Sequence, residues 1–160
     1  MSLTHTICTW RERLSRLPYS LIALLGRFSI AAVFWRSGQT KVDNFSLDVI
    51  SGEFSLGWPS LNDSAVFLFR EEYRLPFISP ELGALLAATA EHVFPLLLVL
   101  GLASRISALA LLGMTLVIQV LVYPGAWPLH GVWATVLLLL AARGPGVVSL
   151  DHWLTGKVCD

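Results

Sequence analysis

Four long apolar stretches, separated by short polar segments and one long one, dominate the hydrophobic pattern of the chain. They cover residues 17–35, 82–103, 106–123 and 129–142. A helix crosses the hydrocarbon of a bilayer with about 20 apolar residues, within a range of about 17 to 25. The first three stretches meet this length, and the fourth must recruit the region around Trp127. The pattern predicts an all-α integral membrane protein, a four-transmembrane-helix bundle formed by residues 1–160 as one domain.

The long polar segment, residues 38–81, is expected to form an extended loop that contains a short helix. Asn62 or Asp63 fits the N-cap position of a helix over residues 65–74, which we expect to lie on the end of the bundle. The motif Ser79-Pro80-Glu81 combines a cap residue, a proline at the first helical position and an acid in the first turn, so it predicts the start of the second span.

Charge and composition narrow the class of protein further. Hydrophobic residues make up 55% and charged residues 14% of the chain, and the formal net charge is zero. A lipid bilayer is therefore the expected partner, and nucleic acid, which requires a basic face, is not. Cys8 and Cys159 lie in the two tails, and the chain has no Cys-x-x-Cys motif. We therefore expect no structural disulfide and no dithiol chemistry carried out by this chain alone.

The distribution of basic residues predicts the orientation in the membrane. They flank the ends of the spans that lie opposite the long loop: Arg11, Arg13, Arg16, Arg105, Arg143 and Lys157. The loop over residues 38–81 carries seven acidic and three basic residues. Because basic residues favour the cytoplasmic side, both termini are predicted to be cytoplasmic and the long loop to be outside.

Arg27, Glu91 and His92 are ionisable residues inside the apolar stretches and are the first candidates for function. Charges in hydrocarbon cost several kcal/mol, so they normally face inward and have partners. Arg27 lies roughly 15 Å from one boundary and Glu91 roughly 14 Å from the other, at a rise of about 1.5 Å per residue. The two depths predict a buried Arg27–Glu91 ion pair near the midplane, which would either serve function or only fix the helix register. Glu91 and His92 are the candidate catalytic residues, since both exchange protons.

A second set of polar residues lies at the depth of His92 or near the outer surface: Gln119 in the third span, and His130 and Trp133 in the fourth. We expect these residues and His92 to line one polar pocket between the four helices, which is where bundles place ligands. For Gln119 and His130 a purely structural bridge between helices is the alternative. No pair of residues shows metal-ligand spacing on one helix, so no metal site is predicted.

Several motifs, in their order along the chain, resemble the DoxX family of small four-span bacterial membrane proteins, which is related to the membrane subunit of thiosulfate:quinone oxidoreductase. They are Gly26-Arg27, Gly38-Gln39-Thr40-Lys41-Val42, Ala90-Glu91, the apolar run to Gly101 with Ser104-Arg105, and Gly144-Pro145-Gly146-Val147-Val148-Ser149-Leu150-Asp151. The resemblance covers nearly all of residues 24–154. Arg27, Lys41, Glu91 and Asp151 match family positions.

The resemblance implies a multi-pass protein of the bacterial cytoplasmic (inner) membrane that belongs to redox or sulfur metabolism or to oxidative stress. Our first hypothesis is a membrane subunit of a quinone-linked oxidoreductase, in which Arg27 holds Glu91 and a quinone lies in the predicted pocket. The chain has no evident bound redox centre, so a partner subunit or a directly reducing substrate would supply the electrons. The alternatives are a scaffold that docks a soluble partner and a transporter of a small solute or metal, which with four spans would need to form an oligomer.

Overall fold

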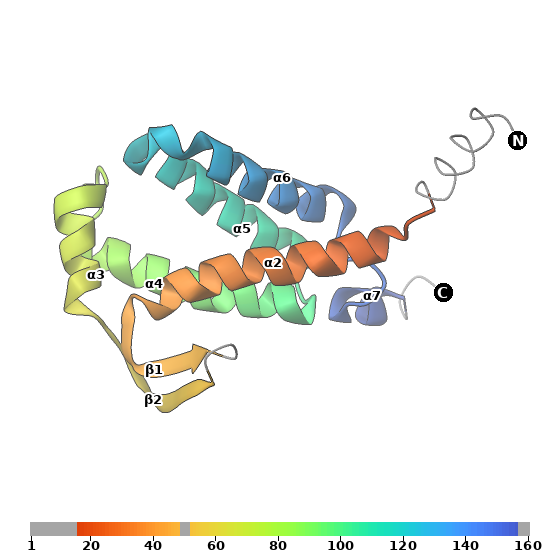
Figure 1. The fold of residues 1–160 in the computed structure, drawn as a ribbon, viewed down its shortest axis with the longest axis horizontal. Coiled ribbons are helices and arrows are strands. Elements are labelled where there is room, and N and C mark those ends of the chain that lie inside the picture. Colours follow the sequence, from red (N-terminus) through yellow and green to blue (C-terminus); the bar gives the residue numbers. More distant parts are fainter. Residues whose placement is uncertain (1–15, 49–51, 157–160) are drawn as a thin grey trace, which may run out of the picture.

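Four helices in the described part of the chain, residues 16–48 and 52–156, are long and apolar enough to cross a membrane (Figure 1). In this computed structural model the spans are built from α2 (Tyr19–Gln39), α4 (Pro80–Leu100), α5 (Ser104–Val117) with the π-helical turn η2 (Ile118–Val122), and α6 (Trp127–Arg143) after the 3-10 turn η3 (Pro124–Ala126). The short helix α7 (Leu150–Thr155) follows. The predicted four-helix membrane bundle is confirmed. Cys8, Arg11, Arg13, Lys157 and Cys159 lie outside the described residues.

The ends of α4 follow from local sequence. Ser79 caps the first turn, because its hydroxyl accepts a hydrogen bond from the backbone N–H of Leu82 at 3.3 Å, and Pro80 occupies the first helical position. The helix ends at Gly101, whose φ of 69° is the left-handed conformation that favours glycine. Helix α2 runs farther than the apolar pattern indicates, since it continues beyond Trp35 to Gln39.

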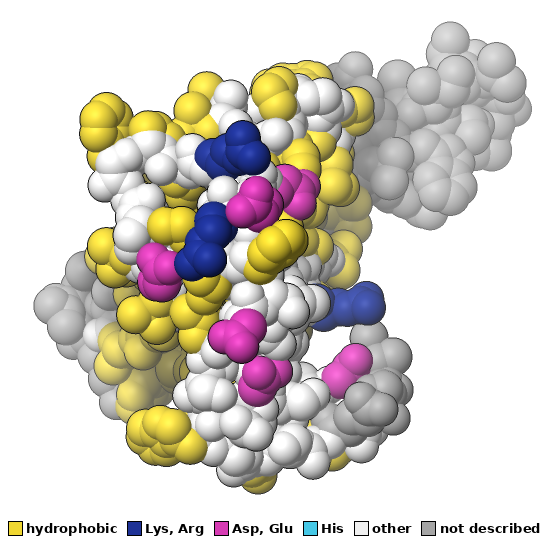
Figure 2. Space-filling view, turned by 90° about the vertical axis from the view of Figure 1, so that its left-hand side faces the viewer, with side chains coloured by type: hydrophobic (Ala, Val, Ile, Leu, Met, Phe, Trp, Pro, Cys, Tyr) yellow, Lys and Arg dark blue, Asp and Glu magenta, His cyan; other side chains and the backbone are white. Residues whose placement is uncertain are grey.

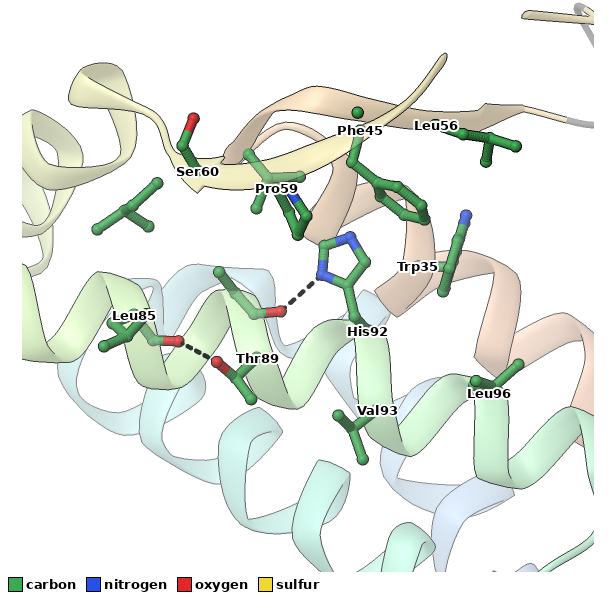
Figure 3. A pocket seen from close by; sticks show the side chains of 14 residues that line it. Trp35, Phe45, Leu56, Pro59, Ser60, Leu85, Thr89, His92, Val93 and Leu96 are labelled. Carbon is green, nitrogen blue, oxygen red and sulfur yellow. Dashed lines mark hydrogen bonds between the residues drawn. The ribbon is translucent and has the colours of Figure 1, made fainter. Parts of the chain in front are cut away.

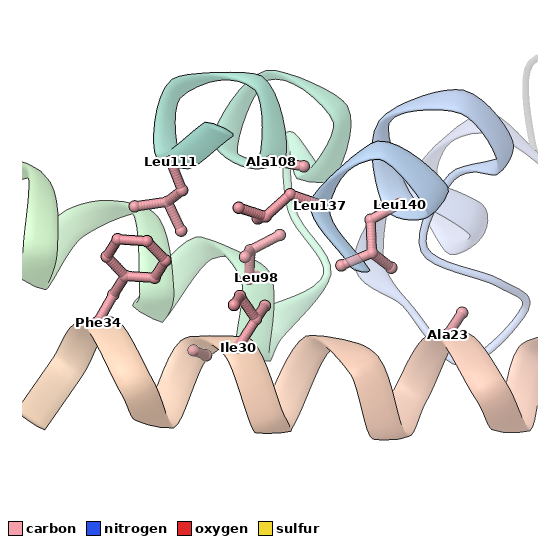
Figure 4. Packing of buried hydrophobic residues seen from close by; sticks show 9 residues of the cluster. Ala23, Ile30, Phe34, Leu98, Ala108, Leu111, Leu137 and Leu140 are labelled. Carbon is pink, nitrogen blue, oxygen red and sulfur yellow. The ribbon is translucent and has the colours of Figure 1, made fainter. Parts of the chain in front are cut away.

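The core of the bundle is apolar and lies where all four spanning helices meet (Figure 4). Helix α2 packs along α4, α5 packs along α6, and the two pairs contact each other through α4–α5 and α2–α6. The buried cluster contains Ala23, Ile30, Ala31, Phe34, Leu98, Ala108, Leu111, Leu137 and Leu140. Many other apolar side chains of the four helices are exposed, as expected for surfaces that face lipid.

A β-hairpin occupies much of the segment that the sequence was expected to leave as loop. Strands β1 (Val42–Asp48) and β2 (Glu53–Leu61) pair antiparallel and lie along the flank of the α2–α4 pair (Figure 1). The register shifts between Asp43 and Phe45, where Asn44 adopts a φ of 66°. Gly57 is required opposite this bulge, because a Cβ there would lie 2.5 Å from the Asn44 carbonyl oxygen.

The predicted loop helix is present and covers one end of the bundle. It consists of α3 (Asp63–Leu68), capped by Asn62, and the π-helical turn η1 (Phe69–Tyr73). Phe69 is buried against Gly83 of α4, so this segment is a packed part of the fold. Figure 2 shows acidic and basic side chains gathered on this end of the molecule, where Arg70 pairs with Glu81 at 2.8 Å. We call it the α3 end; α2 begins and α7 lies at the opposite end (Figure 1).

Candidate functional site

The buried ion pair of this protein joins Lys41 and Glu91. The Lys41 Nζ lies 2.7 Å from the Glu91 Oε2, and the two side chains are 5% and 4% exposed. Ser37 completes the cluster: its hydroxyl donates to Glu91 Oε1 at 3.2 Å and accepts from the Lys41 ammonium at 3.0 Å. The same ammonium also donates to the Ser37 carbonyl oxygen at 3.2 Å. Both charges are therefore compensated and hydrogen-bonded, as buried charges must be.

The predicted Arg27–Glu91 pair is wrong. The register places Gly38 of α2 beside Glu91, because a Cβ on Gly38 would lie 3.0 Å from the Glu91 Cβ. Helical side chains also lean toward the N-terminus of their own helix. Because α2 and α4 are antiparallel, Arg27 and Glu91 lean toward opposite ends of the bundle. Depth along the helix axis alone could not reveal this divergence.

Arg27 instead holds the C-terminal segment on the bundle. It is 2% exposed and donates to the carbonyl oxygens of Leu98 and Val99, both at 2.7 Å, and of Val148, at 2.5 Å. The guanidinium also interacts electrostatically with Asp151. These contacts join the N-terminal half of α2, the end of α4 and the segment before α7.

Asp151 and Gly101 complete this second cluster. The two carboxylate oxygens of Asp151 accept the backbone N–H groups of Ala103 and Ser104, each at 2.8 Å, and so cap α5. The backbone N–H of Asp151 donates to the Gly101 carbonyl oxygen at 2.8 Å. A Cβ on Gly101 would lie 2.5 Å from that of Ser149, so glycine permits this close approach. The geometry assigns the cluster a structural role.

His92 connects α4 to the hairpin. Its Nδ1 lies 2.7 Å from the Ala88 carbonyl oxygen, and its Nε2 lies 2.8 Å from the Gln39 side-chain nitrogen. The Gln39 oxygen accepts from the backbone N–H of Leu47 in β1 at 2.8 Å. Because a carbonyl only accepts, Nδ1 carries the proton and Nε2 accepts from Gln39 in this arrangement. Trp35 adds a second link, since its indole N–H donates to the Leu47 carbonyl oxygen at 3.1 Å.

A cavity of about 650 Å³ lies between the hairpin and α4, beside His92 (Figure 3). Its walls are mostly apolar and include Trp35, Phe45, Leu56, Pro59, Thr89 and His92. The His92 ring points from α4 toward the hairpin and lies 5.1 Å from the Trp35 ring and 6.0 Å from that of Phe45, between ring centroids. A second cavity has a volume of about 670 Å³, and Trp35 and Leu96 line both cavities.

Gln119, His130 and Trp133 come together, but apart from His92. The His130 Nδ1 donates to the Gln119 side-chain oxygen at 2.7 Å, and the His130 and Trp133 rings lie 5.1 Å apart. Gln119 also donates to the Pro124 carbonyl oxygen at 2.7 Å. The expected single pocket between four helices is therefore wrong: His92 faces the hairpin, and the other three residues connect α5 to α6.

Two tyrosines, Tyr73 and Tyr123, lie at the α3 end. Tyr73 packs in the same apolar cluster as Ala87, which lies one turn before Glu91 in α4. Burial and the nearby Glu91 carboxylate raise the pKa of Tyr73. Its ring lies 6.0 Å from that of Tyr123 in an edge-to-face arrangement. Tyr123 donates a hydrogen bond to Glu72, and this bond raises the pKa of Tyr123.

The sequence patterns missed four residues of this site: Trp35, Ser37, Gln39 and Phe45. Lys41 entered only through its match to a family position. The signal that could have revealed these residues is the alternation of Phe45 with Leu47, which is typical of a strand. Such a strand has one apolar face, and this face can pack against the helices. Within the described residues, no group of three or more His, Cys, Asp or Glu side chains could hold a metal ion. The site thus combines an apolar cavity, the hydrogen-bonding pair His92 and Gln39, and the buried Lys41–Glu91 ion pair.

Comparison with known proteins gives one match. The DoxX family model matches residues 22–124, well over half of the chain. This range contains Lys41, Glu91 and His92 as well as the hairpin. No curated protein and no solved structure shows detectable similarity to the chain. The family match, together with the four spanning helices, establishes that this chain belongs to the DoxX family of membrane proteins.

Proposed function

We propose that this protein is the membrane component of a quinone-linked redox system, related to sulfur metabolism or the oxidative stress response. The observation that carries the proposal is the cavity between the hairpin and α4, with His92 in its wall. We place the quinone site in this cavity and not at the expected Gln119–His130 location. The cavity combines aromatic and apolar walls with a hydrogen-bonding pair, His92 and Gln39.

The residues of the cavity suit a quinone. The Trp35 and Phe45 rings provide flat apolar surfaces for a planar ring, and the remaining apolar wall suits an isoprenoid chain. Gln39 donates to His92 and could donate to a quinone carbonyl instead, while His92 Nε2 would then accept from a quinol hydroxyl. When bound, a quinone accepts two electrons and two protons; the chain's own residues orient it and exchange the protons.

The electrons require a donor outside the groups described. A sulfur compound such as thiosulfate is the donor class that the proposal names: two thiosulfate ions form one S–S bond, give tetrathionate and release two electrons. The quinone takes these electrons together with two protons, so charge and atoms balance. A soluble or membrane partner subunit that delivers the same electrons is the other form of this proposal.

Binding of decylubiquinone to the purified protein in nanodiscs tests the site. Thr89→Phe places a bulky side chain in the cavity wall, and we expect it to abolish binding. His92→Phe removes one hydrogen-bonding partner and is expected to weaken binding about tenfold, equivalent to about 1.4 kcal/mol. Thr135→Phe is the matched control, because Thr135 also donates only to the carbonyl four residues earlier in its helix, at 2.8 Å, and lies in α6.

Two results would overturn the proposal. Unchanged binding in Thr89→Phe would remove the ligand from this cavity, and a loss confined to His130→Gln would return it to the Gln119–His130 location. Catalysis is tested separately, by reduction of decylubiquinone with thiosulfate. Absence of turnover, together with binding that does not depend on His92, excludes the quinone-linked function.

The charged surface of the α3 end favours a second candidate, a scaffold that docks a soluble partner (Figure 2). Exposed Arg70 and Arg74 alternate there with acidic side chains, and their ion pairs leave about half or more of each side chain in solvent. Deletion of α3 is unsuitable as a test because Phe69 is buried. Reversal of both charges, by Arg70→Glu with Arg74→Glu, should instead release a partner that co-purifies in stoichiometric amount with the wild type. A partner retained by this variant counts against docking at this surface.

A further inference from the structure

We propose that Tyr73 and Tyr123 form a proton path between the buried Lys41–Glu91 pair and solvent at Glu72. The path rests on the proposed function, because a buried carboxyl needs a route to water only if protons move at the site. The path also gives proton movement a direction, because it leads to the α3 end of the bundle. Toward the opposite end lies the Arg27 cluster, in which the guanidinium donates its hydrogen bonds to backbone carbonyl groups.

The inner end of the path is set by the direction of the Glu91 side chain. Helical side chains lean toward the N-terminus of their helix, so the Glu91 carboxyl leans along α4 toward Ala87 and the α3 end. Tyr73 packs against the same stretch of α4, in one cluster with Ala84 and Ala87. Ala87 lies one turn before Glu91, so Tyr73 packs in the cluster toward which the Glu91 carboxyl leans, and the Glu91 charge contributes to the raised pKa of Tyr73.

The outer end of the path is a second phenol and a carboxylate. The Tyr73 and Tyr123 rings are in contact, with centroids 6.0 Å apart and planes at 88°. The Tyr123 hydroxyl donates to Glu72, so it is oriented to pass a proton outward. Tyr123 is 38% exposed, and this end of the path reaches the surface.

The transfer itself is a chain of proton exchanges that needs no electron carrier. A protonated Glu91 gives its proton to the Tyr73 oxygen as Tyr73 passes its own proton to Tyr123, and Tyr123 passes its own to Glu72. One proton enters at Glu91 and one leaves Glu72 for water, and both phenols end the step neutral. Phenols suit this task because a hydroxyl both donates and accepts.

Infrared spectroscopy of the full-length protein in nanodiscs after a stopped-flow pH jump tests the path without any quinone. The carboxyl band that disappears in Glu91→Gln reports protonation of Glu91. We expect Tyr73→Phe and Tyr123→Phe to slow the appearance of this band about 100-fold, the lower end of what a positioned proton donor contributes. Tyr19→Phe is the matched control, because Tyr19 bonds the Gly144 carbonyl oxygen at the opposite end and should leave the rate unchanged.

Folding and quinone binding are measured on the same variants. Phenylalanine keeps the ring packing, and an unchanged melting temperature separates a lost hydroxyl from a lost fold. Wild-type rates in both Tyr73→Phe and Tyr123→Phe overturn the path, as does a Glu91 band that does not respond to pH in the wild type. Failure of decylubiquinone to bind removes the proposed function, whereas the infrared rates report on the path independently.

Discussion

Removal of the Lys41 charge should destabilise the bundle far more than removal of a surface charge. The Lys41–Glu91 separation is 2.7 Å, and neither side chain is more than 5% exposed. Coulomb's law gives about 6 kcal/mol at this distance with an effective dielectric constant of about 20. Part of this attraction is offset by the free energy needed to take the Lys41 ammonium out of water, and the variant no longer has this cost. We therefore expect Lys41→Met to lower the free energy of unfolding by about 3–5 kcal/mol, the range typical of a broken buried pair.

The penalty should arise mainly from the unpaired Glu91 carboxylate that remains. The double variant Lys41→Met with Glu91→Leu removes both charges and fills the space with apolar side chains. Buried pairs replaced in this way are often as stable as the original or more stable, by about 1–4 kcal/mol. We therefore expect the double variant to match or exceed the wild type, and the two substitutions to be strongly non-additive.

Reversible unfolding in mixed SDS and dodecyl maltoside micelles, followed by tryptophan fluorescence, measures these differences. The matched control is Arg70→Met, which breaks the Arg70–Glu81 pair at a similar N–O distance of 2.8 Å but with side chains 56% and 58% exposed. A surface pair contributes about 0–1 kcal/mol. If Lys41→Met costs no more than Arg70→Met, or if the single and double substitutions add, the reasoning from burial is refuted.

Three further predictions concern the structural cluster and the tyrosines. Asp151→Ala removes the cap from α5 and should lower the unfolding free energy by about 1–2 kcal/mol in the same assay; no change would exclude the capping role. Gly101→Ala, at a φ of 69°, should cost about 2–4 kcal/mol from strain and overpacking, whereas Gly113→Ala, with open space at its Cβ, should be neutral or stabilising. Tyr123 should titrate above the ordinary phenol value of about 10, so its stabilisation is complete below that pH and is lost as the pH rises through the raised value. Absorbance of the phenolate should show Glu72→Gln moving this midpoint downward, and an unmoved midpoint contradicts the assignment.

The helical framework could be predicted because each span has both a composition and a boundary signal. Long apolar runs identify the four spans, and Ser79 with Pro80 marks the start of α4 to the residue. The loop helix was predictable for the same reason, since Asn62 caps it through the N–H of Ser64 at 2.6 Å. These signals are local, so they do not depend on how the helices pack.

The hairpin was not predictable with the same means, because its strand signal is short and interrupted. The bulge at Asn44 shifts the register, so only Phe45 and Leu47 alternate in β1 before the turn. In β2, Gly57 and Pro59 lower the strand propensity, although Phe54 and Trp58 keep the period of two. The cavity and the contacts of His92 depend on this hairpin, so they could not be predicted from the sequence either.

The charged residues of the bundle could be identified from the sequence, but their pairing could not. Arg27 and Glu91 belong to two separate clusters, and depth along the helix axis does not distinguish these clusters. Arg27 is satisfied by carbonyl groups of two segments, the end of α4 and the segment before α7, and by the nearby Asp151, so it holds the C-terminal segment on the bundle. Glu91 is different: its carboxylate pairs with the Lys41 ammonium and accepts from the Ser37 hydroxyl, and we expect an apolar pair in its place to fold as well or better. If the double variant is as stable as we expect, this pair, whose sequence neighbours Val42 and His92 line the cavity, needs a chemical reason for its presence. Proton exchange at Glu91 supplies that reason, and the Lys41→Met with Glu91→Leu variant separates it from folding: the fold should remain while any proton-coupled activity is lost.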